Sequence, residues 1–390
     1  SYFYKTGEGS PYPKGAYESY YSPYLDYFHF SKEEEKDWPE NDSYEKWWGN
    51  DTLPKLNYEN APKLEAEILG IAKKWVSPPF SCDGWRLDVA ADLGHSEAYN
   101  HRFWKKFRKA VKEANEDAVI LAEHYGNPSA WLKGQEWDSI MNYDAFMEPV
   151  SWFLTGMEKH SDRAEPEKFG DGELFFNTMR YNMAKLPENA LDAAMNQLSN
   201  HDHSRFLTRT NRRAGRMKDG FDDAGIGIDY GLFRLASMLL FTWPGAPTLF
   251  YGDEVGVYGW TEPDCRRPYP WGKEDLELLE YHRYLISHRK ASPALKNGNL
   301  MLLKSGKNWV SYLRCSENQI ALIIIYCGDE DCTLDIPLWR ASITDKMEIR
   351  RVLKTDGRGY NAGQTKRYTE NGILSSRLRA KTGKIYLIDF

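Results

Sequence analysis

Three acidic residues stand at the ends of short apolar runs. Asp88 closes the run GWRLD, Glu123 closes VILAE, and Asp202 comes two residues after NQLSN. Glu123 lies 35 residues after Asp88, about one strand–helix unit, and Asp202 lies 79 residues after Glu123, about two such units. Since the carboxyl ends of parallel strands gather at one rim of a βα barrel, we expect the three carboxylates to converge there.

Such a set of carboxylates suits the cleavage of a glycosidic bond. That reaction needs a protonated acid for the leaving oxygen and a second carboxylate at the anomeric carbon, which acts as the nucleophile in the retaining version. Arg86 precedes Asp88 by two residues, so the two share a strand face, and its charge would keep Asp88 ionised. In a strand covered on both sides we expect this pair to be buried. Glu123 follows an apolar run, and partial burial would raise its pKa toward that of an acid.

Alternating strand and helix patterns would position these residues. Five runs predict parallel strands, near residues 84–89, 119–123, 138–142, 196–200 and 247–251. Apolar residues at helical spacing predict helices over 60–76, 96–114, 231–243 and 273–290. In the first helix we expect Asn60 to cap the N-terminus and Leu64, Ile68, Ile71, Ala72 and Trp75 to form the buried stripe. The alternation is typical of parallel βα units with both sheet faces covered.

Three regions of the chain differ in composition and in predicted secondary structure. Residues 1–61 are turn-rich, aromatic and polar, and predict a loop-rich segment. Residues 62–296 carry the βα pattern. From about residue 297 to 390, short β runs separated by turn residues predict a C-terminal antiparallel β-sandwich. The predicted fold is therefore an α/β barrel with an all-β domain behind it.

Composition excludes several classes of function. The net charge is −6 and the pI is near 5.9, which argues against nucleic-acid binding, and no run of 18 apolar residues predicts a membrane span. Five widely spaced cysteines form neither a zinc pattern nor a disulfide framework. We expect free thiols and a reducing, cytoplasmic location. Aromatic residues make up 14% of the chain, which fits core packing and also a cleft that stacks rings against sugars.

Several motifs resemble one enzyme family. DGWRLDVA (83–90), LAEHYG (121–126) and LSNHDHSR (198–205) resemble conserved regions of the α-amylase superfamily of glycoside hydrolases. LPKLN (53–57) is similar to a short motif of its neopullulanase, cyclomaltodextrinase and maltogenic amylase group, and GAPTLFYGDEVGVYGWTEPDCRRPYPW (245–271) resembles that group's eighth strand and following loop. The resemblance runs in the right order from about residue 20 to the C-terminus.

The resemblance implies a role for each matching residue. Asp88 would be the nucleophile, Glu123 the acid/base and Asp202 the stabiliser of the transition state. Substrate-binding residues would be Arg86, His201, His124, Asn200, Glu262 and Arg266. Glu262 stands where relatives tend to have Asp. His203 and Arg205 border the site, where a surface ion-pair role competes with a functional one. The implied activity is retaining hydrolysis of α-1,4 links in maltodextrins, cyclodextrins or pullulan, with cleavage of α-1,6 links left open.

Two alternative functions stay open. A transglycosylase would share every catalytic residue, and only the partition of the glycosyl-enzyme between water and sugar would differ. A non-catalytic carbohydrate-binding or scaffold subunit of the same fold would be expected to lose the carboxylates, and all three are present. We expect no required cofactor and no catalytic metal; a structural Ca²⁺ bound by loop oxygens and a homodimer both stay open.

The strand count predicts a partner segment. A closed barrel needs eight strands, and five are predicted here, which correspond to the family's strands four to eight. Residues 1–61 contain no run that would replace the first three. An arc of five strands would leave open edges and an exposed apolar interior. We therefore expect a complementary N-terminal fragment, which would supply the earlier strands and further site residues.

Overall fold

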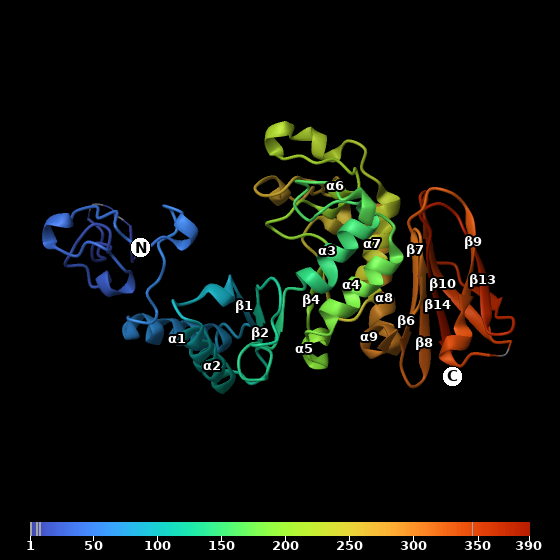
Figure 1. Cartoon of the computed structure of the whole chain (residues 1–390), viewed down its shortest axis with the longest axis horizontal. Helices are drawn as coiled ribbons and strands as arrows, with labels where there is room; N and C mark the ends of the chain where they lie inside the picture. The colour runs from blue at the N-terminus through green and yellow to red at the C-terminus, as the bar shows by residue number, and fades with distance from the viewer. Residues whose placement is uncertain (1, 5–6, 8, 345) are drawn as a thin grey trace. The chain divides into compact units, whose positions relative to one another are not determined.

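The chain forms two compact units, each described by itself. The computed structural model describes residues 2–4, 7, 9–344 and 346–390 (Figure 1). One unit holds the chain up to His124 together with Ser129–Ser139, and the other holds Tyr125–Pro128 and Ile140–Phe390.

The first part of the first unit is ordered by aromatic packing rather than by long elements. Three 3₁₀ turns span Leu25–Tyr27, Glu35–Asp37 and Trp47–Gly49. Isolated antiparallel bridges join Phe28 to Leu56 and Phe30 to Tyr44. Phe3, Phe28, Phe30 and Tyr44 are all buried in one apolar cluster. The loop-rich character predicted for this stretch comes with a small core of its own.

The rest of the first unit is built from alternating helices and parallel strands. α1 (Pro62–Val76) precedes β1 (Gly84–Leu87), and α2 (Glu97–Ala114) precedes β2 (Val119–Ala122). β1 and β2 are parallel, with Gly84 opposite Val119. A Cβ at residue 84 would lie 2.1 Å from the Val119 carbonyl oxygen, so only glycine allows the strands to approach here. β3 (Ser139–Ile140) is the third strand of this sheet.

Two details of α1 differ from the prediction. The N-cap is Ala61, without a side-chain cap, and the Asn60 side-chain amide donates to Asn57 Oδ1. Leu64 and Ala72 are buried, whereas Ile71 and Trp75 remain 36% and 41% exposed. The helical period was correct, but the described residues cover only part of the predicted stripe.

The second unit has parallel strands of its own. Met141 forms a parallel bridge with Met195, at the start of β4 (Met195–Gln197), and β4 pairs in parallel with β5 (Ala246–Thr248). All five predicted parallel strands are present, each shorter than predicted. The helices of this unit are α3 (Glu148–Thr155), α4 (Gly172–Met183), α5 (Glu188–Asp192), α6 (Phe206–Arg209), α7 (Tyr230–Thr242), α8 (Leu276–Ala291) and α9 (Pro293–Asn297).

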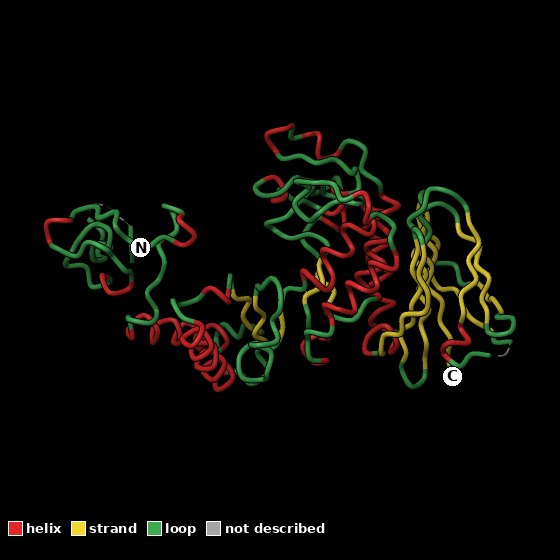
Figure 2. Tube along the Cα trace, in the orientation of Figure 1, coloured by secondary structure: helices red, strands yellow, loops and turns green. Residues whose placement is uncertain are grey.

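The C-terminal part is an antiparallel sandwich, seen as paired yellow strands in Figure 2. Its larger sheet has the order β11-β10-β14-β8-β7-β6, with β12 also paired to β10, and its smaller sheet pairs β9 with β13. The strands are β6 (Asn299–Gly306), β7 (Trp309–Cys315), β8 (Gln319–Tyr326), β9 (Cys332–Pro337), β10 (Glu348–Asp356), β11 (Gly359–Asn361), β12 (Thr365–Tyr368), β13 (Ile373–Leu378) and β14 (Gly383–Asp389).

Both faces of the larger sheet are covered. Leu322 and Ile324 of β8 share one cluster with Ile336 of β9 and Leu374 of β13. Ile323 and Ile325, which alternate with them, pack instead into the main core with α7. This explains why β8 reads as a continuous apolar run. All five cysteines are free thiols. Within the described ranges, no helix combines the length and apolar character needed to cross a membrane.

Candidate active site

Asp88 and Glu123 leave the ends of adjacent parallel strands. β1 ends at Leu87 and β2 at Ala122, which are opposite each other in the sheet, and the Glu123 amide still donates to the Leu87 carbonyl at 2.8 Å. The two carboxylates therefore emerge at the same edge. The Arg86 guanidinium contacts both: Nη1 pairs with Asp88 Oδ1, and Nη2 lies 3.0 Å from Glu123 Oε2.

Burial differs sharply among these three residues. The Glu123 side chain is 9% exposed, Arg86 is 30% exposed, and Asp88 is 75% exposed. The prediction that Arg86 and Asp88 are both buried is thus wrong for Asp88. The strand ends one residue before it, so Asp88 stands in irregular backbone at the open end of the sheet.

The backbone between these carboxylates is strained. Val89 has φ +37°, in the left-handed region that a β-branched residue rarely occupies. Its N–H donates to Glu123 Oε2 at 3.0 Å, which binds the strained residue to the buried carboxylate. Strain of this kind persists where the surroundings fix the chain, and it concentrates at functional sites.

A cavity of about 390 Å³ opens beside Asp88. Its walls combine aromatic and apolar side chains with carboxylates, a composition that suits a sugar ring with its apolar faces and hydroxyl edges. The lining residues are Trp47, Thr52, Leu53, Pro54, Lys55, Leu56, Tyr58, Asp88, Val89, Asp92, Leu93 and Gly94. Four of the five residues of LPKLN line this cavity.

The surroundings of Asp202 are described within the second unit. Its carboxylate lies between two basic side chains. His201 Nε2 is 3.3 Å from Oδ2, and Arg266 Nη2 is 3.4 Å from Oδ1. Arg266 Nε also donates to the His201 carbonyl at 2.8 Å. His201, Asp202 and Arg266, all predicted site residues, are thus brought together, and Asp202 stays 35% exposed.

The other predicted residues lie in different settings. His124 packs against Trp131 and Trp137, with ring centroids 5.0 and 5.8 Å away. Asn200 is only 4% exposed, and its Oδ1 accepts from the Asp202 N–H at 2.9 Å, which places it behind the carboxylate. Glu262 is exposed. Substrate contact by these three residues stays a prediction.

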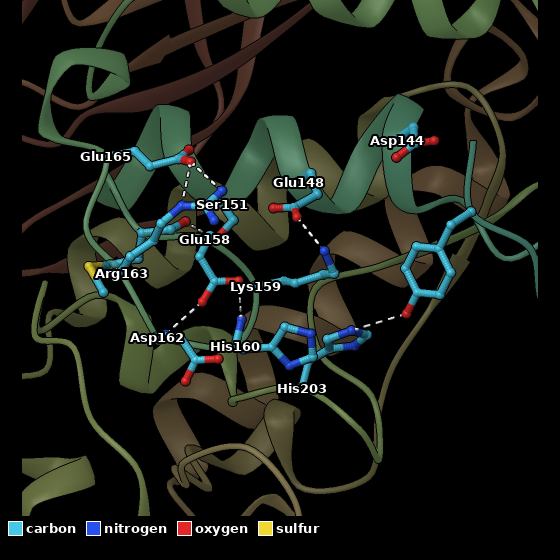
Figure 3. Close-up of polar contacts among 12 residues, drawn as sticks. Asp144, Glu148, Ser151, Glu158, Lys159, His160, Asp162, Arg163, Glu165 and His203 are labelled. Carbon is cyan, nitrogen blue, oxygen red and sulfur yellow. Dashed lines mark hydrogen bonds and ion pairs between the residues drawn. The ribbon is translucent and has the colours of Figure 1, made fainter. Parts of the chain in front are cut away.

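Sequence reasoning missed a polar network that includes His203, the residue after Asp202, and part of it is drawn in Figure 3. The Tyr125 ring stacks on Tyr143 at 4.1 Å, and its hydroxyl lies 3.3 Å from His203 Nε2. Lys159 pairs with Glu148 at 2.5 Å. Tyr143 and Glu148 begin short helical elements, whereas Tyr125, Lys159 and His203 lie in loops and turns. No periodic pattern in the sequence indicates that these residues meet.

His203 and Arg205 do not form surface ion pairs. Both are fully buried. Arg205 pairs with the buried Asp253 at 2.9 Å, and burial lowers the pKa of His203 to about 2. The helix that follows, α6, is also fully buried, including Phe206 and Leu207.

The described residues hold no cluster of three or more His, Cys, Asp or Glu side chains that could bind a metal ion. The structural Ca²⁺ left open by the sequence would need loop carbonyl oxygens as most of its ligands.

Comparisons with known proteins give the family of the chain. Residues 5–362 match the family described as "Alpha amylase, catalytic domain". The chain is 34% identical over 287 residues to neopullulanase 2 of Thermoactinomyces vulgaris, covering 72% of this chain and 43% of that protein. It is 32% identical over 277 residues to a cyclomaltodextrinase of a Bacillus species, covering 70% and 43%. The chain spans less than half the length of these curated relatives.

Solved structures show the same fold. A debranching enzyme of Nostoc punctiforme superposes with a TM-score of 0.73 at 25% identity, over 97% of this chain and 70% of that one. A cyclomaltodextrinase superposes with a TM-score of 0.69 at 26% identity, over 94% and 55%. The predicted fold class, a barrel of this type followed by an antiparallel β domain, is confirmed.

Proposed function

Because the chain belongs to the α-amylase family, through its catalytic domain, we propose that it is a retaining hydrolase of α-glucans. Its substrates are maltodextrins, cyclodextrins or pullulan, cleaved at α-1,4 links and also at α-1,6 links. Asp88 is the nucleophile, Glu123 the general acid and base, and Asp202 the stabiliser of the oxocarbenium-like transition state.

The first step forms a covalent intermediate. Asp88 attacks the anomeric carbon while the bond to the leaving oxygen breaks, and Glu123 gives its proton to that oxygen. In the second step Glu123 takes a proton from water, the resulting hydroxide bonds to the anomeric carbon, and the Asp88 ester bond breaks. The two inversions retain the α configuration.

The observation that carries the proposal is the bridge made by Arg86. One guanidinium contacts the exposed Asp88 carboxylate and the buried Glu123 carboxylate. The two acids thus share a cation but differ in solvation, and this difference is what separates a nucleophile from an acid. The names of the related neopullulanase and cyclomaltodextrinase supply the α-glucan class.

Release of reducing sugar from maltodextrin, cyclodextrin and pullulan tests the proposal. We expect release by the wild-type chain and loss of release in Asp88→Asn, with both proteins giving the same circular dichroism spectrum. Chromatography of the products separates hydrolysis from transfer, since a transglycosylase makes longer oligosaccharides. If the protein from its natural source, with any additional polypeptide, binds maltodextrin but releases no reducing sugar, the carbohydrate-binding alternative is favoured.

A further proposal concerns the edge of the first sheet. In the described residues β1 is the last strand of its sheet, and the nearby Trp75, Phe80 and Val119 are exposed. We propose that a complementary segment adds parallel strands at this edge and covers the apolar side chains. Intact-mass spectrometry of the protein from its natural source should find additional polypeptide. A monodisperse species with the mass of this chain alone would contradict it.

A further inference from the structure

Side chains hold the backbone of Asp202 from both sides. Asn200 Oδ1 accepts a hydrogen bond from the Asp202 N–H at 2.9 Å. Thr261 Oγ1 donates to the Asp202 carbonyl oxygen at 3.3 Å. Both peptide groups that flank the Asp202 Cα are therefore fixed by neighbouring side chains.

Each of these two side chains, Asn200 and Thr261, also contacts a histidine. His203 Nδ1 lies 2.6 Å from Asn200 Oδ1, and His160 Nδ1 lies 3.2 Å from Thr261 Oγ1. The two imidazole rings are 4.5 Å apart, and Figure 3 shows them side by side. Two parallel chains of hydrogen bonds thus converge on Asp202, one through Asn200 and one through Thr261.

The hydrogen bonds assign the protons on both rings. An amide oxygen only accepts, so His203 Nδ1 must carry the proton that it shares with Asn200. Its Nε2 then accepts from the Tyr125 hydroxyl, 3.3 Å away. The Thr261 hydroxyl donates its only proton to the Asp202 carbonyl. In its contact with His160 the hydroxyl oxygen must therefore accept, so His160 Nδ1 carries a proton and donates it. Burial lowers the pKa of both histidines, which keeps both rings neutral.

The turn that presents His160 is rigid. Glu158 is 7% exposed and its two oxygens accept from the N–H groups of His160, at 2.9 Å, and Asp162, at 2.6 Å. Ser161 has φ +63°, a strained conformation for this residue type. The Ser204 hydroxyl fastens the turn through the Lys159 carbonyl at 3.0 Å.

We propose that His160 is a positioning residue for the transition-state carboxylate, acting on Asp202 through the Thr261 hydroxyl. The inference rests on the proposed role of Asp202. His160 comes from the loop between α3 and α4, far from Asp202 in sequence, and touches no reacting atom. Its Nδ1–H orients the Thr261 hydroxyl, and that hydroxyl holds the peptide from which the Asp202 side chain projects.

Two matched substitutions test the role of the Nδ1–H. His160→Phe keeps a planar ring and removes the donor, whereas His160→Asn places an amide N–H near the position of Nδ1. We expect His160→Phe to lower kcat and to weaken binding of deoxynojirimycin, a cationic glucose mimic, by roughly 3- to 10-fold, as for one lost hydrogen bond. Product inhibition by maltose, a ground-state ligand, should stay unchanged. His160→Asn should restore both values.

A double substitution tests the path through Thr261. Thr261→Val removes the hydroxyl and keeps the shape, so it should reproduce the effect of His160→Phe, and the combined variant should be no worse than either single one. Additive losses would overturn the inference, as would equal weakening of deoxynojirimycin and maltose. If His160→Phe does not fold, His160→Leu, which also removes the donor, takes its place in the same comparisons.

A reference variant separates this inference from the proposed function. Asp202→Asn should weaken deoxynojirimycin far more than maltose. If it does not, the proposed role of Asp202 fails, whatever the His160 variants do. If it does, and His160→Phe behaves as wild type, the positioning role of His160 alone is refuted.

Discussion

The buried imidazole of His203 predicts a loss of stability in mild acid. Its side chain is fully buried and its pKa is lowered to about 2, chiefly by burial. In the unfolded chain a histidine titrates near 6.5. Between these two values the unfolded state binds one more proton than the folded state, so stability falls as pH drops from about 6.5.

The magnitude follows from the proton count. Each pH unit below 6.5 costs about 1.4 kcal/mol for one such group. At pH 7 the unfolded histidine is mostly neutral and the cost is small. At pH 5 the unfolded chain is protonated, so the change from pH 7 to pH 5 lowers the free energy of unfolding by about 2 kcal/mol. His160 adds to this loss, because its pKa is also lowered.

Urea denaturation followed by tryptophan fluorescence measures the effect. The His203→Asn variant keeps a donor toward Asn200 and cannot titrate, so the other groups cancel when it is compared with wild type. We expect the variant to lose about 2 kcal/mol less than wild type between pH 7 and pH 5. Equal losses in the two proteins would refute the reasoning, since His203 would then be protonated in the folded state.

Three further predictions concern the proposed reaction. Glu123→Gln should lower kcat on maltodextrin by at least roughly 100-fold, and much less on aryl glucosides whose leaving groups need no proton; equal losses on both would exclude Glu123 as the acid. Proton NMR of the earliest product should show the α anomer, and a β anomer would exclude Asp88 as a nucleophile. Arg86→Lys should lower kcat by roughly 10-fold or more, because a single ammonium group replaces a planar guanidinium that contacts both carboxylates. An unchanged kcat would show that this contact is dispensable.

The strands and the carboxylates could be predicted because their signals are local. The run GWRLD predicts a strand, the end of that strand and a charge pair within five residues, and Glu123 follows its strand in the same way. The error at Asp88 is also local. A sequence pattern predicts that a strand exists better than it predicts where the strand ends. Pairing stops at Leu87, so Asp88 is exposed rather than buried.

The support behind Asp202 could not be predicted, because it depends on contacts between distant loops. His160 meets Thr261 across 101 residues, and no periodic pattern precedes either of them. For His203 the sequence left a surface ion-pair role and a functional role open, and neither role predicted its burial. Its burial depends on Asn200 and Tyr125, two partners that only the folded chain brings to its ring.

The bridge of Arg86 has a consequence for the electrical state of the pocket during turnover. Before reaction, an ionised Asp88, a protonated Glu123 and Arg86 sum to zero charge. In the covalent intermediate Asp88 is an uncharged ester and Glu123 has given up its proton, and the sum is again zero. The guanidinium contacts Asp88 Oδ1 and Glu123 Oε2. The negative charge therefore moves from Asp88 to Glu123 while both remain next to the same cation. The pocket would therefore need no counter-ion to enter or leave between the two half-reactions, and salt should change substrate capture more than turnover.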